Sequence, residues 1–299
     1  MDPTEARVGI VVRTKNRPQL LARALADIAD QTYQDWRVEV VDDGGDAAAV
    51  DRVLSALPDA VRARVGVVHH DVSQGRSAAA NAGIRRLDTE YAVLHDDDDR
   101  WAPSFLARTV RWLDAHPGHV GVAVRTEIVY EAERDGAFVE VGRAPFWPGL
   151  HRITYSELLR VNRFVPIAYL YRRAVHDEVG FYREDVHAAE DWEFNLRVAA
   201  LHPIGFLGEE PLAFWHQRAG VEGELGNSMF ALAQDHDDYD MMVRDEALRA
   251  YVAEHGVGLP LYLTRFLQDE IARQLDERRS LGERATDMVR RWRRERRMR

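Results

Sequence analysis

Four short apolar runs in the first hundred residues alternate with segments whose apolar residues recur at helical spacing. The runs cover 8–13, 37–41, 65–70 and 91–94, and helices are predicted from Pro18 onward and at 47–57, 75–87 and 103–115. Such continuous runs are typical of strands buried on both faces. Strands that alternate with helices of about 10–15 residues indicate βαβ units. The first part of the chain therefore predicts an α/β fold with a mostly parallel central sheet.

After residue 116 this pattern changes. Residues 120–131 and 138–141 alternate between apolar and polar side chains, which predicts an antiparallel hairpin around Asp135-Gly136. The next stretch, 142–153, is rich in proline, glycine and aromatic residues and is predicted to be a loop. Further strands are expected at 167–171 and 212–216, a helix at 190–201, and helices again from about residue 228.

Four consecutive aspartates, Asp96 to Asp99, follow the predicted strand 91–94. Carboxylates packed this densely repel one another unless a cation lies among them. Mg²⁺ and Mn²⁺ take oxygen ligands, often one or two carboxylates together with substrate phosphates, and ligands of open α/β sheets bind beyond the carboxyl ends of the strands. One hypothesis is therefore a metal site that holds a phosphorylated ligand. The alternative is a solvated acidic turn that caps the next helix, and this stretch alone leaves both open.

Two further acidic pairs are expected near the same edge of the sheet. Asp42-Asp43 end the second strand in a glycine turn, and Glu190-Asp191 open a helix. The glycine patterns that bind phosphate through backbone amides are missing: there is no Gly-x-x-x-x-Gly-Lys-Ser/Thr, and no Gly-x-Gly-x-x-Gly follows the first strand. A metal must then neutralise the phosphate, and a separate carboxylate is left for general-base work.

The composition excludes several classes of protein. The chain has 299 residues, 46% of them hydrophobic, which is enough to bury a sizeable core. It contains no cysteine, so disulfides and thiolate zinc sites are excluded, and any metal must use oxygen or nitrogen ligands. We find no run of about 18 apolar residues that would predict a membrane span, and the polar N-terminus lacks a signal-peptide core. We therefore expect a cytoplasmic protein.

The net charge of −10 is unevenly distributed. Residues 279–299 contain nine arginines and three acidic residues, a net charge of +6, so the preceding residues carry −16. Leu281, Ala285, Met288 and Trp292 recur at helical spacing among those arginines, which suits a helix lying peripherally on the inner face of the membrane. The pattern also suits self-association or packing on a partner subunit. Nucleic acid is not an expected partner, because the rest of the chain is strongly acidic.

Four short motifs carry a resemblance to a known family. They are Arg13-Thr14-Lys15-Asn16-Arg17-Pro18, Val41-Asp42-Asp43-Gly44-Gly45, His95-Asp96-Asp97-Asp98-Asp99-Arg100-Trp101 and Ala189-Glu190-Asp191-Trp192. Each resembles a motif of the family 2 glycosyltransferases with the GT-A fold, the third resembling its DXD region, and the four occur in the family's order. The resemblance implies transfer of a sugar from a nucleotide-sugar donor, by default a UDP-sugar, to an acceptor hydroxyl, usually with inversion at the anomeric carbon.

The family's fold is a Rossmann-like, mostly parallel central sheet flanked by helices, here with a C-terminal helical extension. The resemblance divides the chain into a GT-A domain, 1–225, and a helical region with the basic tail, 226–299. Within the domain, 1–117 would bind the nucleotide sugar and 118–225 the acceptor, a saccharide or lipid-linked saccharide. The implied reaction belongs to bacterial polysaccharide or glycoconjugate synthesis.

The resemblance also assigns donor-binding roles. Thr14 and Asp43 would contact the nucleobase and ribose, and Asp96 and Asp98 would hold the donor ribose and a Mn²⁺ or Mg²⁺ ion. The exact metal ligands within the aspartate run stay open by one residue, and His216 would complete the metal shell or meet the diphosphate. The whole set of donor-contacting candidates is Arg13, Thr14, Asn16, Asp43, Arg76, Asp96, Asp97 and Arg218.

Arg76 belongs to this set because the chain departs from the family. The family often has Ala-Arg-Asn in the helix after the third strand, whereas this chain has Ala79-Ala80-Asn81. Arg76, one turn earlier, is the candidate to replace the missing arginine at the diphosphate.

The resemblance makes Asp191 the expected catalytic base, with the adjacent Glu190 as the competing candidate. Acidic residues favour the first turn of a helix, so a purely structural role is the simpler interpretation of either residue alone. If Asp191 is the base, the amides of the helix start should keep it ionised at neutral pH.

Two other functions stay open. A nucleotidyltransferase on a related fold would need a glycine-rich basic loop after the first strand, and residues 13–17 contain no glycine. A non-catalytic nucleotide-sugar-binding protein would keep the fold without the transfer.

Aromatic and acidic residues elsewhere have simpler interpretations. Trp101, Trp147 and Trp192 are interpreted as core residues rather than platforms for sugar rings. Asp235-His236-Asp237-Asp238 is interpreted as a solvated helix face rather than a metal cluster.

Overall fold

The computed structural model describes residues 6–134, 137–221, 223–226 and 233–277. It divides into two compact units, residues 1–240 and 241–299. Both β-sheets lie in the first unit, together with the beginning of helix α10 (Ala233–His255). The first turns of α10 belong to the first unit. The predicted division into a GT-A domain, 1–225, and a helical region, 226–299, stays a prediction.

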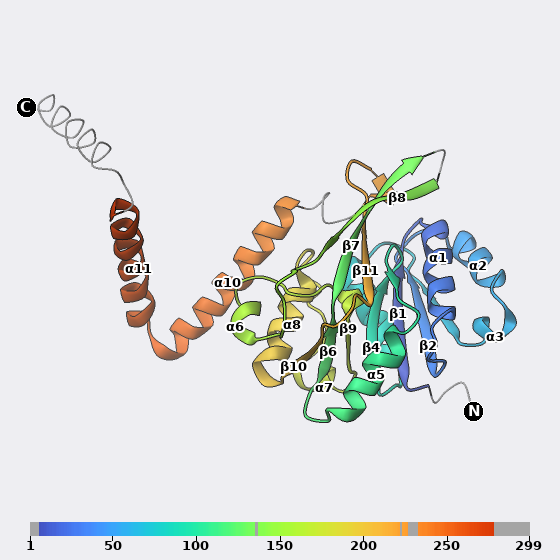
Figure 1. Ribbon diagram of the computed structural model, residues 1–299, viewed down its shortest axis with the longest axis horizontal. Helices are drawn as coiled ribbons and strands as arrows, with labels where there is room; N and C mark the ends of the chain where they lie inside the picture. The colour runs from blue at the N-terminus through green and yellow to red at the C-terminus, as the bar shows by residue number, and fades with distance from the viewer. Residues whose placement is uncertain (1–5, 135–136, 222, 227–232, 278–299) are drawn as a thin grey trace, which may run out of the picture. The chain divides into compact units, whose positions relative to one another are not determined.

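A seven-stranded sheet forms the centre of the first unit, in the order β10-β6-β9-β4-β1-β2-β3 (Figure 1). The strands are β1 (Val8–Thr14), β2 (Trp36–Asp42), β3 (Val65–His69), β4 (Tyr91–Asp96), β6 (Gly121–Val124), β9 (Tyr169–Arg172) and β10 (Ile204–Leu207). β1 runs parallel to both of its neighbours, β2 and β4, and β2 is parallel to β3. β9 runs antiparallel to β4 and β6. The predicted α/β fold with a mostly parallel sheet is confirmed.

Helices connect these strands much as the sequence predicted. They are α1 (Pro18–Ala29), α2 (Ala47–Ser55), α3 (Asp59–Arg62), α4 (Arg76–Arg86) and α5 (Phe105–Ala115). α1 begins with Pro18, which is favoured where a helix N–H would be unpaired anyway. α4 approaches the sheet closely, because a Cβ added to Gly83 would lie only 2.4 Å from the Val11 side chain. Close packing of α4 on β1 therefore depends on the absence of a side chain at residue 83.

A second sheet of four strands has the order β5-β11-β7-β8. Its strands are β5 (Arg100–Trp101), β7 (Thr126–Arg134), β8 (Ala137–Pro145) and β11 (Ala213–Gln217). β7 and β8 form the long green hairpin of Figure 1. β11 is parallel to β7 and antiparallel to β5. The pairing of β11 with β5 therefore places residues 213–214 beside Arg100 and Trp101, which directly follow the aspartate run.

The segment 120–131, predicted as one strand, is two strands in different sheets. β6 belongs to the large sheet and β7 to the small one, and the change occurs at Arg125. The Arg125 guanidinium donates to the carbonyl oxygens of Gly208 at 2.7 Å and Leu150 at 3.1 Å. The predicted loop 142–153 was also partly wrong, because β8 continues through Pro145. The alternation of apolar and polar residues continues through both β6 and β7, so the sequence pattern gives no sign of the break at Arg125.

The remaining described helices that lie wholly in the first unit are α6 (Tyr155–Leu158), α7 (Val175–Val179), α8 (Glu190–Leu201) and the 3-10 helices η2 (Pro166–Ala168) and η3 (Gly223–Leu225). The α8 prediction is confirmed to the residue. Strand β10, which we did not predict, follows Pro203 directly. Trp101 and Trp192 are each 3% exposed, which confirms their interpretation as core residues.

The second unit contains the rest of α10 and helix α11 (Gly258–Glu277). Helices are therefore confirmed for the described part of the predicted helical region. None of the described helices is long and apolar enough to cross a membrane. The predicted basic helix around Leu281 to Trp292 lies outside the described residues.

Candidate active site

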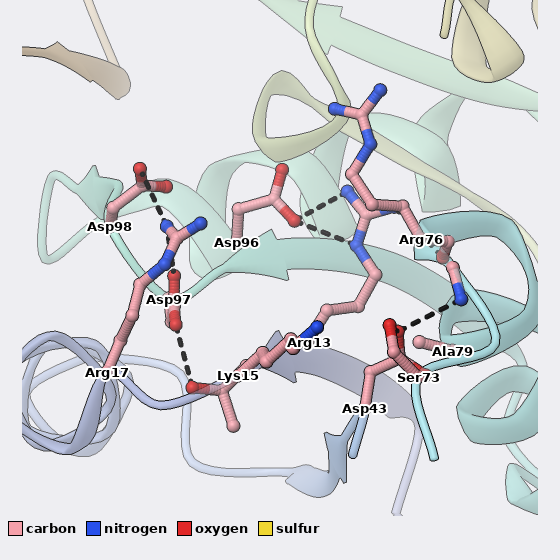
Figure 2. Close-up of a pocket in the computed structure, with 12 residues that line it drawn as sticks. Arg13, Lys15, Arg17, Asp43, Ser73, Arg76, Ala79, Asp96, Asp97 and Asp98 are labelled. Carbon is pink, nitrogen blue, oxygen red and sulfur yellow. Dashed lines mark hydrogen bonds and ion pairs between the residues drawn. The ribbon is translucent and has the colours of Figure 1, made fainter. Parts of the chain in front are cut away.

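The carboxyl ends of three parallel strands bring the predicted donor residues to one edge of the large sheet. In the register of β1 with β4, Arg13 lies opposite Asp96. In the register of β1 with β2, Thr14 lies opposite Asp42. Figure 2 shows the side chains that follow these strand ends pointing toward one another across a shared cavity.

Arg13 and Asp96 form a close ion pair at this edge. Nε and Nη2 of Arg13 donate to Oδ1 of Asp96 at 2.8 and 2.5 Å (Figure 2). Burial alone would raise the pKa of Asp96, but the charge and hydrogen bond of Arg13, together with the charges of Arg76 and Arg17, outweigh burial and hold that pKa below its usual value. Burial likewise opposes the charge on Arg13, whose pKa is nevertheless raised by Asp96 and Glu190. Asp96 is therefore an ionised carboxylate at neutral pH.

The other aspartates of the run have different surroundings. The Thr14 hydroxyl donates to Oδ2 of Asp97 at 2.7 Å, and Nη1 of Arg17 donates to Asp97 and Asp98 at 3.2 and 3.3 Å. Burial, strengthened by repulsion from Asp98 and only partly offset by Arg17, raises the pKa of Asp97 to about 7. Burial and the same repulsion raise the pKa of Asp99, whose Oδ1 accepts the backbone N–H of His216 at 2.8 Å. The run is therefore four carboxyl groups in four environments.

Asp43 holds the loop before α4. Its oxygens accept the Ser73 hydroxyl at 2.7 Å and the backbone N–H groups of Gln74 and Gly75 at 2.8 and 3.0 Å, and Oδ1 lies 2.9 Å from Nδ1 of His70. Burial opposes ionisation, but these hydrogen bonds lower the pKa of Asp43. Asp43 therefore shapes the wall of the cavity as well as lining it.

Asn16 lies in the left-handed conformation, with φ 54°. Its Oδ1 accepts the backbone N–H of Asp46 at 2.9 Å. Among the described residues, those lining the two cavities defined below do not include Asn16. Its predicted contact with the donor stays a prediction.

Two adjoining cavities open at this edge. The first, of about 210 Å³, is lined by Thr14, Asp43, Ser73 and Asp97, among others. The second, of about 440 Å³, is lined by Glu190, Asp191 and several aromatic residues. Both cavities are lined by Arg13, Arg76, Asp96 and Asp98. A ligand bound in one cavity would therefore meet a ligand bound in the other at these four residues.

The start of α8 puts two carboxylates into the second cavity. Glu190 accepts from Nη1 of Arg13 at 3.4 Å and from Nη2 of Arg76 at 3.2 Å. Asp191 instead accepts the side-chain amide of Asn162 at 2.7 Å. Ala189, just before them, has the left-handed φ of 61° that is uncommon for a residue other than glycine. Backbone strain of this kind is concentrated at functional sites.

The pKa of Asp191 is raised to about 7. Burial is the main cause, and the negative charge of Glu190 adds to it, while the backbone N–H of Trp192 and the arginines 76 and 13 act in the opposite direction. Our expectation that helix-start amides keep Asp191 fully ionised was therefore wrong, because burial outweighs them. A carboxylate with this pKa exchanges protons near neutral pH.

An aromatic wall faces the same cavity. Trp147, Phe146 and Trp215 line it, with the Phe146 ring 5.6 Å from Trp147 and 5.4 Å from Trp215 between centroids. Trp147 has the left-handed φ of 51°, donates Nε1–H to the carbonyl of Asn162 at 3.1 Å, and is stacked by Arg163 at 4.5 Å. Trp147 and Trp192 both line the cavity, whereas Trp101 does not. Trp192 is almost fully buried and Trp147 is only partly buried, so for Trp147 a role as a sugar platform stays open.

The sequence suggested that His216 and Arg218 reach the donor site, but in the structure neither side chain lines either cavity. Nδ1 of His216 lies 2.8 Å from Oε1 of Glu131. Arg218 is completely buried and donates to Oε2 of Glu131 at 3.0 Å and to Oδ2 of Asp98. The described residues lining either cavity include neither of them. Glu131 was missed by the sequence analysis, because a single acid within an alternating strand carries no signal.

The residues present fit a divalent cation bound together with a substrate. The described part of the chain contains no group of three histidine or acidic side chains that could hold a metal by themselves. Mg²⁺ and Mn²⁺ sites in nucleotide enzymes, however, commonly use one or two carboxylates plus phosphate oxygens. Asp96 and Asp98 line both cavities and supply that donor set. His236 and Asp237 line the second cavity, so part of the 235–238 segment is not simply a solvated face.

Comparison with known proteins decides the family. A family model described as Glycosyl transferase family 2 matches residues 9–180, more than half of the chain. The chain belongs to glycosyl transferase family 2. The predicted resemblance is confirmed, and the nucleotidyltransferase alternative is not supported.

Relatives with similar sequences carry the same assignment. The chain is 29% identical over 194 residues to the uncharacterized glycosyltransferase YwdF of Bacillus subtilis, covering 64% of this chain and 68% of that one. It is 24% identical over 214 residues to the putative colanic acid biosynthesis glycosyl transferase WcaA of Escherichia coli, covering 71% and 73%. The protein is therefore a glycosyltransferase.

Solved structures share the fold. Staphylococcus aureus TarS matches with a TM-score of 0.59 and 16% identity over 81% of this chain, which spans only 40% of that chain. A mannosyltransferase from Pyrobaculum calidifontis, solved with GDP-Man and Mn²⁺, matches with a TM-score of 0.57 and 22% identity, over 83% of this chain and 66% of that one. At these identities the likeness establishes the GT-A fold and no more.

Proposed function

We propose that this glycosyltransferase moves a sugar from a nucleoside diphosphate sugar, by default a UDP-sugar, to a saccharide hydroxyl with inversion at the anomeric carbon. The observation that carries the proposal is the pair of adjoining cavities that share Arg13, Arg76, Asp96 and Asp98. The smaller cavity suits the nucleotide, and the larger one, which contains Asp191, suits the acceptor. Structures of the same fold that contain UDP-GlcNAc or GDP-Man support this donor class.

The diphosphate is proposed to lie at the shared residues. Arg13 and Arg76 supply positive charge there, although both are paired with Glu190 before the donor arrives. Asp96 and Asp98 would hold Mn²⁺ or Mg²⁺, which when bound neutralises charge on the departing diphosphate. Arg76 lines both cavities, which supports its role as substitute for the arginine missing at Ala80.

Asp191 is proposed to be the catalytic base. It lines only the larger cavity, whereas Glu190 beside it is occupied by two arginines. In the reaction an Asp191 oxygen takes the proton of the acceptor hydroxyl, and the acceptor oxygen bonds to the anomeric carbon. The bond from that carbon to the diphosphate oxygen breaks, and its electron pair leaves with the nucleoside diphosphate. Attack from the face opposite the leaving group inverts the anomeric centre.

The acceptor is proposed to be a saccharide or lipid-linked saccharide. Aromatic rings such as Trp147 and Phe146 offer flat apolar faces in the larger cavity, and Asn162 and Asp191 offer hydrogen bonds beside them. The relative named for colanic acid biosynthesis supports an acceptor that belongs to a growing bacterial polysaccharide.

The basic segment 279–299 is proposed to dock on an anionic membrane surface, where a lipid-linked acceptor would be presented. An arginine near such a surface contributes roughly 1 kcal/mol. Helix α11 directly precedes this segment and exposes Leu259, Leu263 and Leu267, which are 53%, 42% and 53% exposed. The cytoplasm, at the inner face of the membrane, is the corresponding location.

A thermal-shift panel of UDP-, GDP- and dTDP-sugars with and without Mn²⁺ tests the donor class. One nucleotide is expected to raise the melting temperature, and more strongly with Mn²⁺ than with chelator. Asp191→Asn should keep that shift and lose transfer to acceptor. If no nucleotide sugar shifts the wild-type protein, the donor assignment fails.

A further inference from the structure

A buried cluster of charged side chains lies next to the aspartate run, centred on Glu131 of β7. Glu131 is 7% exposed. Its Oε1 accepts from Nη1 of Arg23 at 2.6 Å and lies 2.8 Å from Nδ1 of His216, and its Oε2 accepts from Nη1 of Arg218 at 3.0 Å. One carboxylate thus connects α1, β11 and the residue directly after β11.

Both arginines continue from Glu131 to Asp98. Nη2 of Arg23 donates to the main-chain oxygen of Asp98 at 2.7 Å, and Nη2 of Arg218 donates to its carboxylate. Asp98 is therefore held at its backbone and at its side chain by the two guanidinium groups that Glu131 fixes. Asp98 lines both cavities, while the described lining residues include neither Glu131 nor either arginine.

The strand is irregular at this position. Tyr130 pairs with Gly142 but Glu131 pairs with Glu140, so Val141 is passed over and the register shifts between Tyr130 and Glu131. Irregularities of this kind redirect side chains and are over-represented beside active sites. Because of this shift in register, the direction of the Glu131 side chain differs from the one that regular strand pairing would give it.

Stability alone is a weak reason for such a cluster. Removing charges from water costs free energy that buried ion pairs often fail to recover, and apolar replacements of such pairs are frequently as stable. Burial opposes the ionisation of Glu131, but His216 and Arg23 outweigh it and lower its pKa to about 2. The Glu131 carboxylate is therefore charged at neutral pH. The effect of this charge is to fix the orientation of Arg23 and Arg218.

We propose that Glu131 is a positioning residue for donor binding, which fixes Arg23 and Arg218 so that they present the Asp98 carboxylate to the donor's diphosphate and its divalent cation. This role rests on the proposed donor site. It also gives Arg218 a different task from the one the sequence suggested, because a completely buried guanidinium acts through Asp98 rather than on the donor.

The test is a double-mutant cycle on nucleotide binding, measured by calorimetry with UDP and with GDP in the presence of Mn²⁺. Supporting residues of this kind typically change metal affinity by about 10–100-fold, so Glu131→Gln should weaken nucleotide binding by about that factor. The double variant with Asp98→Asn should bind no more weakly than Asp98→Asn alone, because Glu131 acts only through Asp98. Glu133→Gln, an exposed glutamate two residues along β7, is the matched control and should bind like the wild type.

Arg23→Gln provides a second variant in case Glu131→Gln does not fold, since it removes one link and leaves the glutamate in place. It should show the same non-additivity with Asp98→Asn. Wild-type affinity in a folded Glu131→Gln protein overturns the positioning role. A loss that simply adds to that of Asp98→Asn also overturns it, because a general structural defect behaves in that way. A wild-type protein that binds neither nucleotide would instead refute the donor site on which the role rests.

Discussion

The pH dependence of transfer should report the ionisation of Asp191. Its pKa is raised to about 7, by burial first and by the charge of Glu190 next. The base form is the deprotonated one, so activity is present above the pKa and is lost as the pH falls through it. About one-tenth of the enzyme is active at pH 6 and about one-hundredth at pH 5, because each pH unit below the pKa changes the ionised fraction about tenfold. The plateau should begin near pH 8.

Two substitutions separate the neighbouring carboxylates. Asp191→Asn removes the proton acceptor and should reduce turnover by about 10²–10⁴-fold, and the residual rate should lose the acid limb of the profile. Glu190→Gln removes a charge that raises the pKa of Asp191 and leaves Arg13 and Arg76 to act on it alone. Its acid limb should therefore move to lower pH, and a displacement of one unit would correspond to about 1.4 kcal/mol.

The assay is kcat/KM for the acceptor between pH 5 and 9 at saturating donor, which reports groups of the enzyme before it binds the acceptor, with nucleotide affinity measured separately at each pH. A flat profile in the wild type, with nucleotide binding constant, would refute the assignment of Asp191. Near-normal turnover in Asp191→Asn together with an inactive Glu190→Gln would move the base by one residue. Normal turnover in both would make this helix start structural.

Three further predictions concern the metal, the packing and the tail. Asp98→Ala, and chelator added to the wild type, should each weaken calorimetric binding of UDP by at least about tenfold, and equal affinity with and without chelator would exclude the metal. Gly83→Ala should lower the free energy of unfolding by about 1–3 kcal/mol in urea titrations, because its Cβ would lie 2.4 Å from Val11, whereas unchanged stability would show that α4 can shift. Deleting residues 280–299 should abolish sedimentation with anionic liposomes at low salt and leave transfer to a soluble acceptor intact, and unchanged sedimentation would favour a partner subunit.

The edge of the sheet was predictable because its physical cause is local. The apolar runs at 8–13, 37–41 and 91–94 predict strands, and parallel strands necessarily bring their carboxyl ends together. Arg125 was not predictable as the point where one strand becomes two, since alternation continues on both sides of it. Glu131 was not predictable either, because its partners Arg23 and Arg218 lie 108 and 87 residues away in the sequence.

At the start of α8 the sequence likewise could not distinguish two neighbouring residues, because it does not show which distant side chains contact each of them. Sequence placed Glu190 and Asp191 together at a helix start and left either as the base. Their surroundings differ because arginines from β1 and α4 meet Glu190, whereas an amide of the 159–165 loop meets Asp191. Burial at that point, which the sequence does not display, then reverses the direction expected for the pKa of Asp191.

The aspartate run suggested a metal because four adjacent carboxylates need positive charge. In the structure that charge is supplied by the protein itself: Arg13 pairs with Asp96, Arg17 with Asp97 and Asp98, and Arg218 with Asp98. Repulsion within the run is therefore no argument for a resident ion, and the described residues form no complete metal cluster. The reason to expect a cation is the donor instead, since a diphosphate brings its own negative charge to Asp96 and Asp98 and supplies the missing oxygen ligands. Metal and nucleotide should consequently bind with positive cooperativity, each weakly without the other.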